Sequence, residues 1–239
     1  MTKTFMQTAL FAGMLGLISP SAQAGSNTAT PDWTGFYIGA SLGAAAANTI
    51  ATPAVAMPTG ETLIGNSQTG SAFTVGAKAG FDKQIGSFVI GAFGEVDYLH
   101  IATRGIFAEG GDNSTWGTQV GDLLGSARVR IGATSENVMI YGSGGLAVAH
   151  SGVSGWFYET LLDGAGPMDF PNNRLGLVIG GGIEYRLNQT ISVNLDYSHY
   201  LFSASNSVQE FSDENEGPTM GGTNRTGIDV MKVGLNYRF

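Results

Sequence analysis

The chain has 239 residues and a formal net charge of −8, and only 13% of its residues are charged. The acidic balance argues against nucleic acid as a partner, and the absence of cysteine excludes disulfides and thiol chemistry. The charge content is well below the usual ~25%, yet no run of 18 apolar residues follows residue 24. This combination excludes a membrane helix in the mature chain and indicates apolar residues spread over one face of many strands.

The N-terminus has the features of a secretory signal peptide. Lys3 supplies a short positive region, residues 9–18 form an apolar run, and Ala22-Gln23-Ala24 has the small-x-small pattern of a cleavage site. The apolar run is too short to span a membrane, which needs about 20 residues. We therefore predict cleavage after Ala24. The expected organisation is a signal peptide at 1–24, a short N-terminal segment at 25–32 and one domain at 33–239.

From Trp33 onwards, the sequence alternates between blocks with a two-residue period and polar connections. In the first block, Phe36, Ile38 and Leu42 share one face. Period two indicates β-strands, because successive side chains leave opposite faces of a strand. The blocks predict eight strands, which in chain order are 33–46, 72–83, 87–101, 121–133, 138–150, 173–187, 191–202 and 226–239.

The connections between these blocks alternate in length. Because neighbouring strands are expected to be antiparallel, all short connections fall at one end of the strands and all long ones at the other. Outer-membrane barrels sort their turns and loops in this way, whereas a soluble sandwich has no reason to do so. The short connections are 84–86, 134–137 and 188–189, and the long ones are 47–69, 102–119, 151–172 and 203–225. The predicted fold is all-β, an eight-stranded antiparallel transmembrane β-barrel with short periplasmic turns and long extracellular loops.

Aromatic residues on the apolar face gather near the strand ends. From Phe88 to Tyr98, about ten residues at ~3.3 Å each and ~40° tilt span about 25 Å of height. This matches the apolar band between two aromatic girdles in an outer-membrane barrel. The girdle candidates are Phe36, Phe81, Phe88, Tyr185, Tyr237 and Phe239 at the short-turn ends, and Phe73 and Tyr98 at the opposite ends.

Charged residues collect on the other face of the predicted strands. An unpaired charge in a narrow lumen is costly, so opposite signs should pair or meet water. Side chains just fill the interior of an eight-stranded barrel, which favours a polar plug. A narrow ion path along the basic cluster is the open alternative. The predicted lumen charge network consists of Lys78, Glu95, Asp97, Arg128, Arg130, Glu184, Arg186, Asp196, Lys232 and Arg238.

The long connections are strongly acidic, and the densest group is Asp213-Glu214-Asn215-Glu216. Oxygen ligands of this kind can hold a divalent cation, but the spacing of a Ca²⁺ loop is missing, so we predict solvated loops and no metal site. Trp156, Phe157 and Tyr158 in the third long connection are candidates for contact with a ligand, a lipid or a host surface. Packing against the barrel rim is the alternative.

No constellation in the sequence supports catalysis or a cofactor. Ser198 lies next to His199, and Ser151 next to His150, but adjacent strand residues face opposite ways. No nucleophile elbow or phosphate-binding loop appears in a suitable context. The histidines, including His100, fall near the outer strand ends on the lipid-facing side, where an interface tolerates a polar ring. We predict that the protein is not an enzyme and holds no cofactor.

Several segments resemble the RopB-like family of alphaproteobacterial outer-membrane surface antigens, which are small OmpA-like eight-stranded barrel proteins. The resemblance spans about 33–239. The segments that carry it begin at Trp33 (WTGFYIGA), Ser87 (SFVIGAFGEVD), Met139 (MIYGSGGLA), Gly180 (GGGIEYRL) and Val233 (VGLNYRF). The resemblance implies an abundant envelope protein that supports membrane integrity and surface interactions. The terminal strand, with Tyr237 and Phe239, resembles the signal that the barrel-assembly machinery reads.

These observations predict a structural barrel in the bacterial outer membrane that supports envelope integrity and presents acidic surface loops. Two alternatives remain open at this point. One is a narrow porin-like channel for ions or small solutes, and the other is an adhesin or ligand-binding protein that acts through its loops. The expected partners are outer-membrane lipid and lipopolysaccharide, the barrel-assembly machinery and a possible host or surface ligand.

Overall fold

The computed structural model describes residues 32–56, 66–109, 112–156, 168–203, 205–210 and 219–239. Within these ranges, side chains are described at 32–48, 69–101, 123–149, 174–203 and 226–239. The predicted signal peptide therefore lies outside the described residues, and its cleavage stays a prediction.

Ten β-strands make up this part of the chain. In chain order they are β1 (Gly35–Ala56), β2 (Asn66–Ile85), β3 (Phe88–Leu99), β4 (Ile101–Glu109), β5 (Asp112–Ser135), β6 (Val138–Trp156), β7 (Met168–Arg186), β8 (Ile191–Phe202), β9 (Ser205–Glu210) and β10 (Thr219–Arg238). In the described ranges, no helix has the length and hydropathy needed to cross a membrane.

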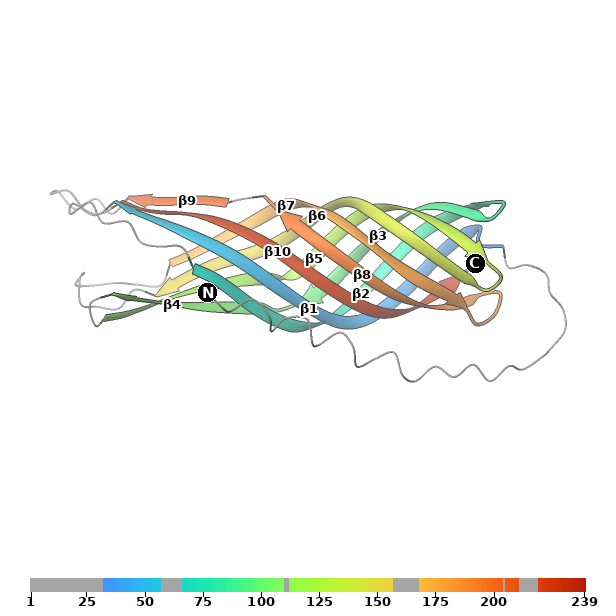
Figure 1. The fold of residues 1–239 in the computed structure, drawn as a ribbon, viewed down its shortest axis with the longest axis horizontal. Coiled ribbons are helices and arrows are strands. Elements are labelled where there is room, and N and C mark those ends of the chain that lie inside the picture. Colours follow the sequence, from blue (N-terminus) through green and yellow to red (C-terminus); the bar gives the residue numbers. More distant parts are fainter. Residues whose placement is uncertain (1–31, 57–65, 110–111, 157–167, 204, 211–218) are drawn as a thin grey trace, which may run out of the picture. The chain divides into compact units, whose positions relative to one another are not determined.

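The strands close into an antiparallel barrel. Neighbours pair in the order β1, β2, β3, β5, β6, β7, β8 and β10, and β1 pairs with β10 to complete the ring. The tilted strands wind around one axis (Figure 1). β4 also pairs with β5, and β9 with β10, so these two short strands continue the positions of β3 and β8. Ten strands thus occupy eight positions, which confirms the predicted eight-stranded barrel.

Three tight turns lie at the barrel end that also holds the C-terminus (Figure 1). Gly86 begins the two-residue turn between β2 and β3 with a φ of +62°, a conformation that glycine adopts without strain. Glu136 holds the corresponding place between β5 and β6 with a φ of +50°. In the third turn, the Asn188 side-chain oxygen accepts hydrogen bonds from the backbone N–H groups of Thr190 and Ile191, at 2.9 and 2.8 Å.

The strands extend well into the segments that we predicted as long connections. β1 continues to Ala56 and pairs with β10 from Tyr37 to that end, and the predicted connection at 102–119 is a hairpin of β4 and the start of β5. The predicted outer ends of β1, β2, β5, β6, β7 and β10 were therefore wrong, whereas the predicted bounds of β8 were right. An alternating apolar pattern arises only where one face of a strand meets a core or lipid. Backbone pairing can continue beyond that region, where no apolar pattern marks it in the sequence.

Burial alternates along the wall with the period that the sequence predicts. In β3 and β8, nearly every second residue is buried and the residues between them are exposed. The exposed residues are the large apolar ones, such as Leu42 and Phe73, the latter 90% exposed. The inward positions hold most of the buried charge. This inverted arrangement suits a wall that faces lipid, because large apolar side chains would be unfavourable in water.

Candidate functional site

The lumen is the most distinctive chemical feature of the described part of the chain. All ten residues of the predicted charge network are buried. Asp82 and Arg174 are buried there too, and our prediction missed them. Alternation alone could have found both, since Phe81 and Leu175 beside them face outward. The buried set therefore contains seven basic and five acidic side chains among the described residues.

Asp82 organises the charges nearest the tight turns. Arg130 donates to it through both Nε and Nη2, and the Nε–Oδ1 distance is 2.8 Å. Arg238 donates from Nη2 to Oδ2 at 2.8 Å. These bonds join β2, β5 and β10 across the lumen. A bidentate arginine–carboxylate pair fixes orientation as well as charge, so Asp82 determines where both guanidinium groups lie.

Glu184 completes this first layer. Its carboxylate accepts bonds from Arg130 Nη1 at 3.1 Å, Ser192 Oγ at 2.5 Å and Asn236 Nδ2 at 2.9 Å. Arg130 also lies over the rings of Tyr37 and Tyr141, 4.6 and 5.2 Å from their centroids. The layer thus satisfies its buried charges with hydrogen bonds and aromatic faces, as burial in a low dielectric requires.

A second charged layer lies further from the turns, on the other side of Phe93. Glu95 receives Arg128 Nη2 at 2.7 Å and Lys232 Nζ at 2.7 Å. Lys232 also donates to both oxygens of Asp97, at 3.0 and 2.8 Å. Phe93 stands between the layers, because its ring lies 5.4 Å from the Arg128 guanidinium and 6.0 Å from that of Arg130.

Neutral donors complete the second layer. Asp196 accepts from Tyr141 at 2.9 Å and from Ser198 at 2.8 Å, and its carboxylate lies 3.8 Å from Arg128 Nη1. Arg128 additionally donates to the Tyr200 hydroxyl. Lys78 is buried beside these groups on β2. The two layers together form a continuous, hydrogen-bonded polar plug.

Trp33 closes the lumen at the tight-turn end. Its side chain is fully buried, and it clusters with Val89, Met139 and Tyr141. Its carbonyl oxygen accepts a bond from Arg238 Nη1 at 2.5 Å. The guanidinium of Arg186 lies 4.8 Å from the indole ring. Trp33, two residues before β1, thus covers the polar plug with an aromatic cap.

The opposite half of the lumen is apolar, which our prediction of a polar inner face missed. Buried side chains from seven of the eight barrel positions form one hydrophobic cluster there. They include Leu99, Leu124, Val178, Phe202 and Ile228. The inner face changes character along the strand axis. Each strand of the ring crosses both parts of the lumen. Whether its inward residues are polar or apolar therefore depends on their position along the barrel axis.

Most other predicted candidates lie at the edges of the described residues. Trp156 ends β6, while Phe157, Tyr158 and the acidic group at 213–216 lie outside the described residues. The contact patch therefore stays a prediction. In the described ranges, no group of three or more His, Cys, Asp or Glu residues could hold a metal ion.

The histidine neighbourhood follows the predicted strand alternation. Ser198 is fully buried in the lumen, whereas His199 is partly exposed on the outside. His199 Nδ1 lies 2.7 Å from Asp229 Oδ1, to which Tyr197 donates at 2.6 Å. Ser198 and His199 therefore cannot act together on one substrate.

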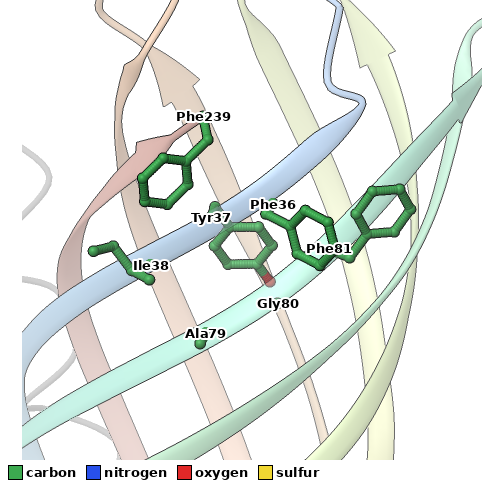
Figure 2. Close-up of a pocket in the computed structure, with 7 residues that line it drawn as sticks. All are labelled: Phe36, Tyr37, Ile38, Ala79, Gly80, Phe81 and Phe239. Carbon is green, nitrogen blue, oxygen red and sulfur yellow. The ribbon is translucent and has the colours of Figure 1, made fainter.

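The outer wall carries a shallow groove near the C-terminus, with a volume of about 480 Å³. Figure 2 shows Phe36 and Phe81 on one side of it and Phe239 on the other. Tyr237 packs edge-on against Phe239 at 5.2 Å between ring centroids. Both residues face outward. These aromatic rings form an apolar belt at the tight-turn end, where interfacial aromatics are expected.

Comparison with known proteins supports this architecture. The model of a family described as outer membrane protein beta-barrel domain matches residues 9–239. No curated protein matches the chain significantly. Outer membrane protein OprG from Pseudomonas aeruginosa is similar with a TM-score of 0.56 and 10% identity, over 88% of this chain and 98% of that one. The outer membrane protease OmpT from Escherichia coli has a TM-score of 0.53 and 10% identity, over 90% and 99%. Neisserial surface protein A has a TM-score of 0.42 and 15% identity, over 86% and 98%.

Proposed function

Because this chain belongs to the outer membrane protein beta-barrel domain family and resides in the bacterial outer membrane, we propose that it is a structural component of that membrane. In this role it supports envelope integrity and presents acidic loops at the cell surface. The resemblance of its strands to RopB-like surface antigens agrees with this role. We further propose that it acts without catalysis, since the described carboxylates of the lumen are engaged by arginine, lysine or neutral donors.

The filled lumen carries this proposal. An ion that entered from the tight-turn side would meet Trp33, then two layers of paired charges, then a packed apolar layer. A dry apolar constriction opposes ion passage because the ion must lose its hydration there. Opening the polar layers would also separate buried ion pairs, which is strongly unfavourable. The arrangement favours a rigid wall over a pore.

Conductance of the purified, refolded full chain in a planar bilayer tests the proposal. We expect no discrete openings, with folding shown by a shift between unboiled and boiled samples on a detergent gel. A strain that lacks the protein should become sensitive to detergent, and the wild-type chain should restore resistance. Discrete openings that disappear when Arg128 and Arg130 are neutralised would replace the structural role with the channel alternative.

We also propose that the C-terminal strand serves as an assembly signal for the barrel-assembly machinery. The support is its position: Tyr237 and Phe239 face outward at the chain end, where another protein can reach them before the barrel closes. Lipid and lipopolysaccharide are the proposed partners of the apolar outer wall. The proposed partner of the loops is a host or surface ligand.

A further inference from the structure

Arg174 occupies an unusual place in the lumen. It points inward from β7 at the outer end of the apolar layer, opposite Ala149 of β6, and only 6% of the residue is exposed. Two positions nearer the turns, Gly176 lies under the ring of Phe202. β8 ends at Phe202, and Arg174 reaches past this end to Thr226 of β10. The guanidinium is therefore held over the apolar layer.

The hydrogen bonding of Arg174 leaves one buried edge of its guanidinium group without a partner. Nη1 donates to Thr226 Oγ1 at 3.0 Å. Nε and Nη2 are buried and have no hydrogen-bond partner in the described part of the chain. The N–H groups of Nε and Nη2 are parallel and together form the fork that binds a carboxylate through both of its oxygens. Thr226 orients the group while this fork stays free.

The same fork is filled in Arg130, another arginine of the lumen. Arg130 uses Nε and Nη2 to bind the two oxygens of Asp82. Arg174 has no comparable carboxylate among the described side chains, and a buried guanidinium donor without a partner is costly. Asp82, the partner of Arg130, belongs to the described chain, whereas no described side chain pairs with Nε and Nη2 of Arg174. Thr226 orients the Arg174 guanidinium, and the acceptor for Nε and Nη2 is missing among the described residues.

The surroundings narrow the chemistry of that acceptor. In the described lumen, Arg174 is the single basic side chain at this level, so one negative charge suffices to balance it. Val178, Phe202 and Ile228 below it are buried apolar residues. We propose that Arg174 binds the carboxylate of a small monocarboxylic acid with an apolar body at the outer end of the lumen. Low exposure strengthens such a pair, because water screens it less.

Binding of benzoate to the refolded full chain in detergent micelles, measured by equilibrium dialysis, tests the site. We expect saturable binding of about one benzoate per chain that falls at least about tenfold in Arg174→Gln, since the variant loses the charge-assisted hydrogen bonds to the carboxylate. Arg174→Lys keeps the charge but lacks the fork, so binding should fall by a similar factor. Thr226→Val should weaken binding less, because it removes the contact that orients Arg174 and leaves the fork itself in place.

The matched control is Lys83→Gln, which removes one exposed positive charge at the opposite end of the barrel and should leave binding unchanged. Benzamide tests the need for charge, and inorganic phosphate tests the preference for a monocarboxylate. Non-saturable benzoate binding, equal binding of benzamide or phosphate, or unchanged binding in both Arg174 variants would each overturn the proposal. If Arg174→Gln fails the gel test for folding, benzoate binding by Arg174→Lys and Thr226→Val decides whether the site exists.

Discussion

Single residues in the lumen carry more than one structural task. Asp82 accepts bonds from Arg130 and Arg238, and through them it ties three strands together. The partners of Asp82 lie far along the chain, so its neighbours in the sequence do not show this role. Its importance comes from closure of the barrel, which brings β2, β5 and β10 around one carboxylate.

The Asp82→Asn variant should lower the free energy of unfolding by about 3–5 kcal/mol, because it removes the carboxylate that two buried guanidinium groups share and leaves only Glu184 near them. Urea unfolding in micelles, followed by the loss of the fast-migrating folded band on gels, measures this change. Removing the carboxylate while keeping the side-chain shape isolates the charge. A loss below about 1 kcal/mol would show that the layer does not depend on Asp82.

Asp32→Asn is the matched control for that experiment. Asp32 is exposed and lies before β1, where hydrogen bonds from the Thr34 hydroxyl and N–H lower the pKa of its carboxyl group. Because this pKa is lower in the folded state, the ionised carboxylate stabilises the fold at pH values above its ordinary pKa. This stabilisation is lost as the pH falls through the folded-state pKa. Since Asp32 is surrounded by water, the control should unfold nearly like wild type at neutral pH.

At the scale of elements, the alternating pattern predicted each barrel strand but, in most strands, not the outer end. β10 begins at Thr219, whereas the predicted strand begins at 226. Its outer residues pair with β1 and β9 by backbone hydrogen bonds that any side chain allows. Backbone pairing has no period in the sequence, so the pattern of apolar residues cannot show where a ladder ends.

The turn between β5 and β6 offers a test at this scale. Glu136 has a φ of +50°, which costs an L-residue roughly 1 kcal/mol. Glu136→Gly should therefore raise the free energy of unfolding by about 0.5–1 kcal/mol, seen as a higher urea midpoint. Gly86→Ala, at a φ of +62° in the neighbouring turn, should lower it. A drop in stability for Glu136→Gly would mean that the Glu136 side chain stabilises this turn.

The C-terminal strand allows a second test. Deleting Phe239 removes the last ring of the outward aromatic pair, whose partner is Tyr237. Under the proposed assembly role, the deletion should reduce the amount of folded protein in the outer membrane several-fold while purified chains still refold in detergent. Ile85→Ala, which also removes an exposed apolar side chain at the tight-turn end, is the control. Equal loss in refolding and in cells would assign Phe239 to stability alone.

At the scale of the whole molecule, the lumen is ordered in layers along the barrel axis. Trp33 covers one end, two sets of ion pairs fill the middle, and an apolar layer that includes Leu99 and Ile228 fills the rest. Each of the eight strands that close the barrel contributes to more than one layer. The layers arise because tilted strands bring residues of different sequence positions to the same height, so a strand-by-strand analysis cannot assemble them.

The sequence by itself determined that this protein is an eight-stranded outer-membrane barrel, because a lipid-facing wall imposes a period of two and sorted turns on the chain. It also indicated most inward charges, since alternation assigns a face to each residue. Only the tertiary structure decided which charges pair, that part of the lumen is apolar, and that Nε and Nη2 of Arg174 are buried without a partner. Those features depend on distances across the closed barrel, where contacting residues such as Asp97 and Lys232 are far apart in sequence.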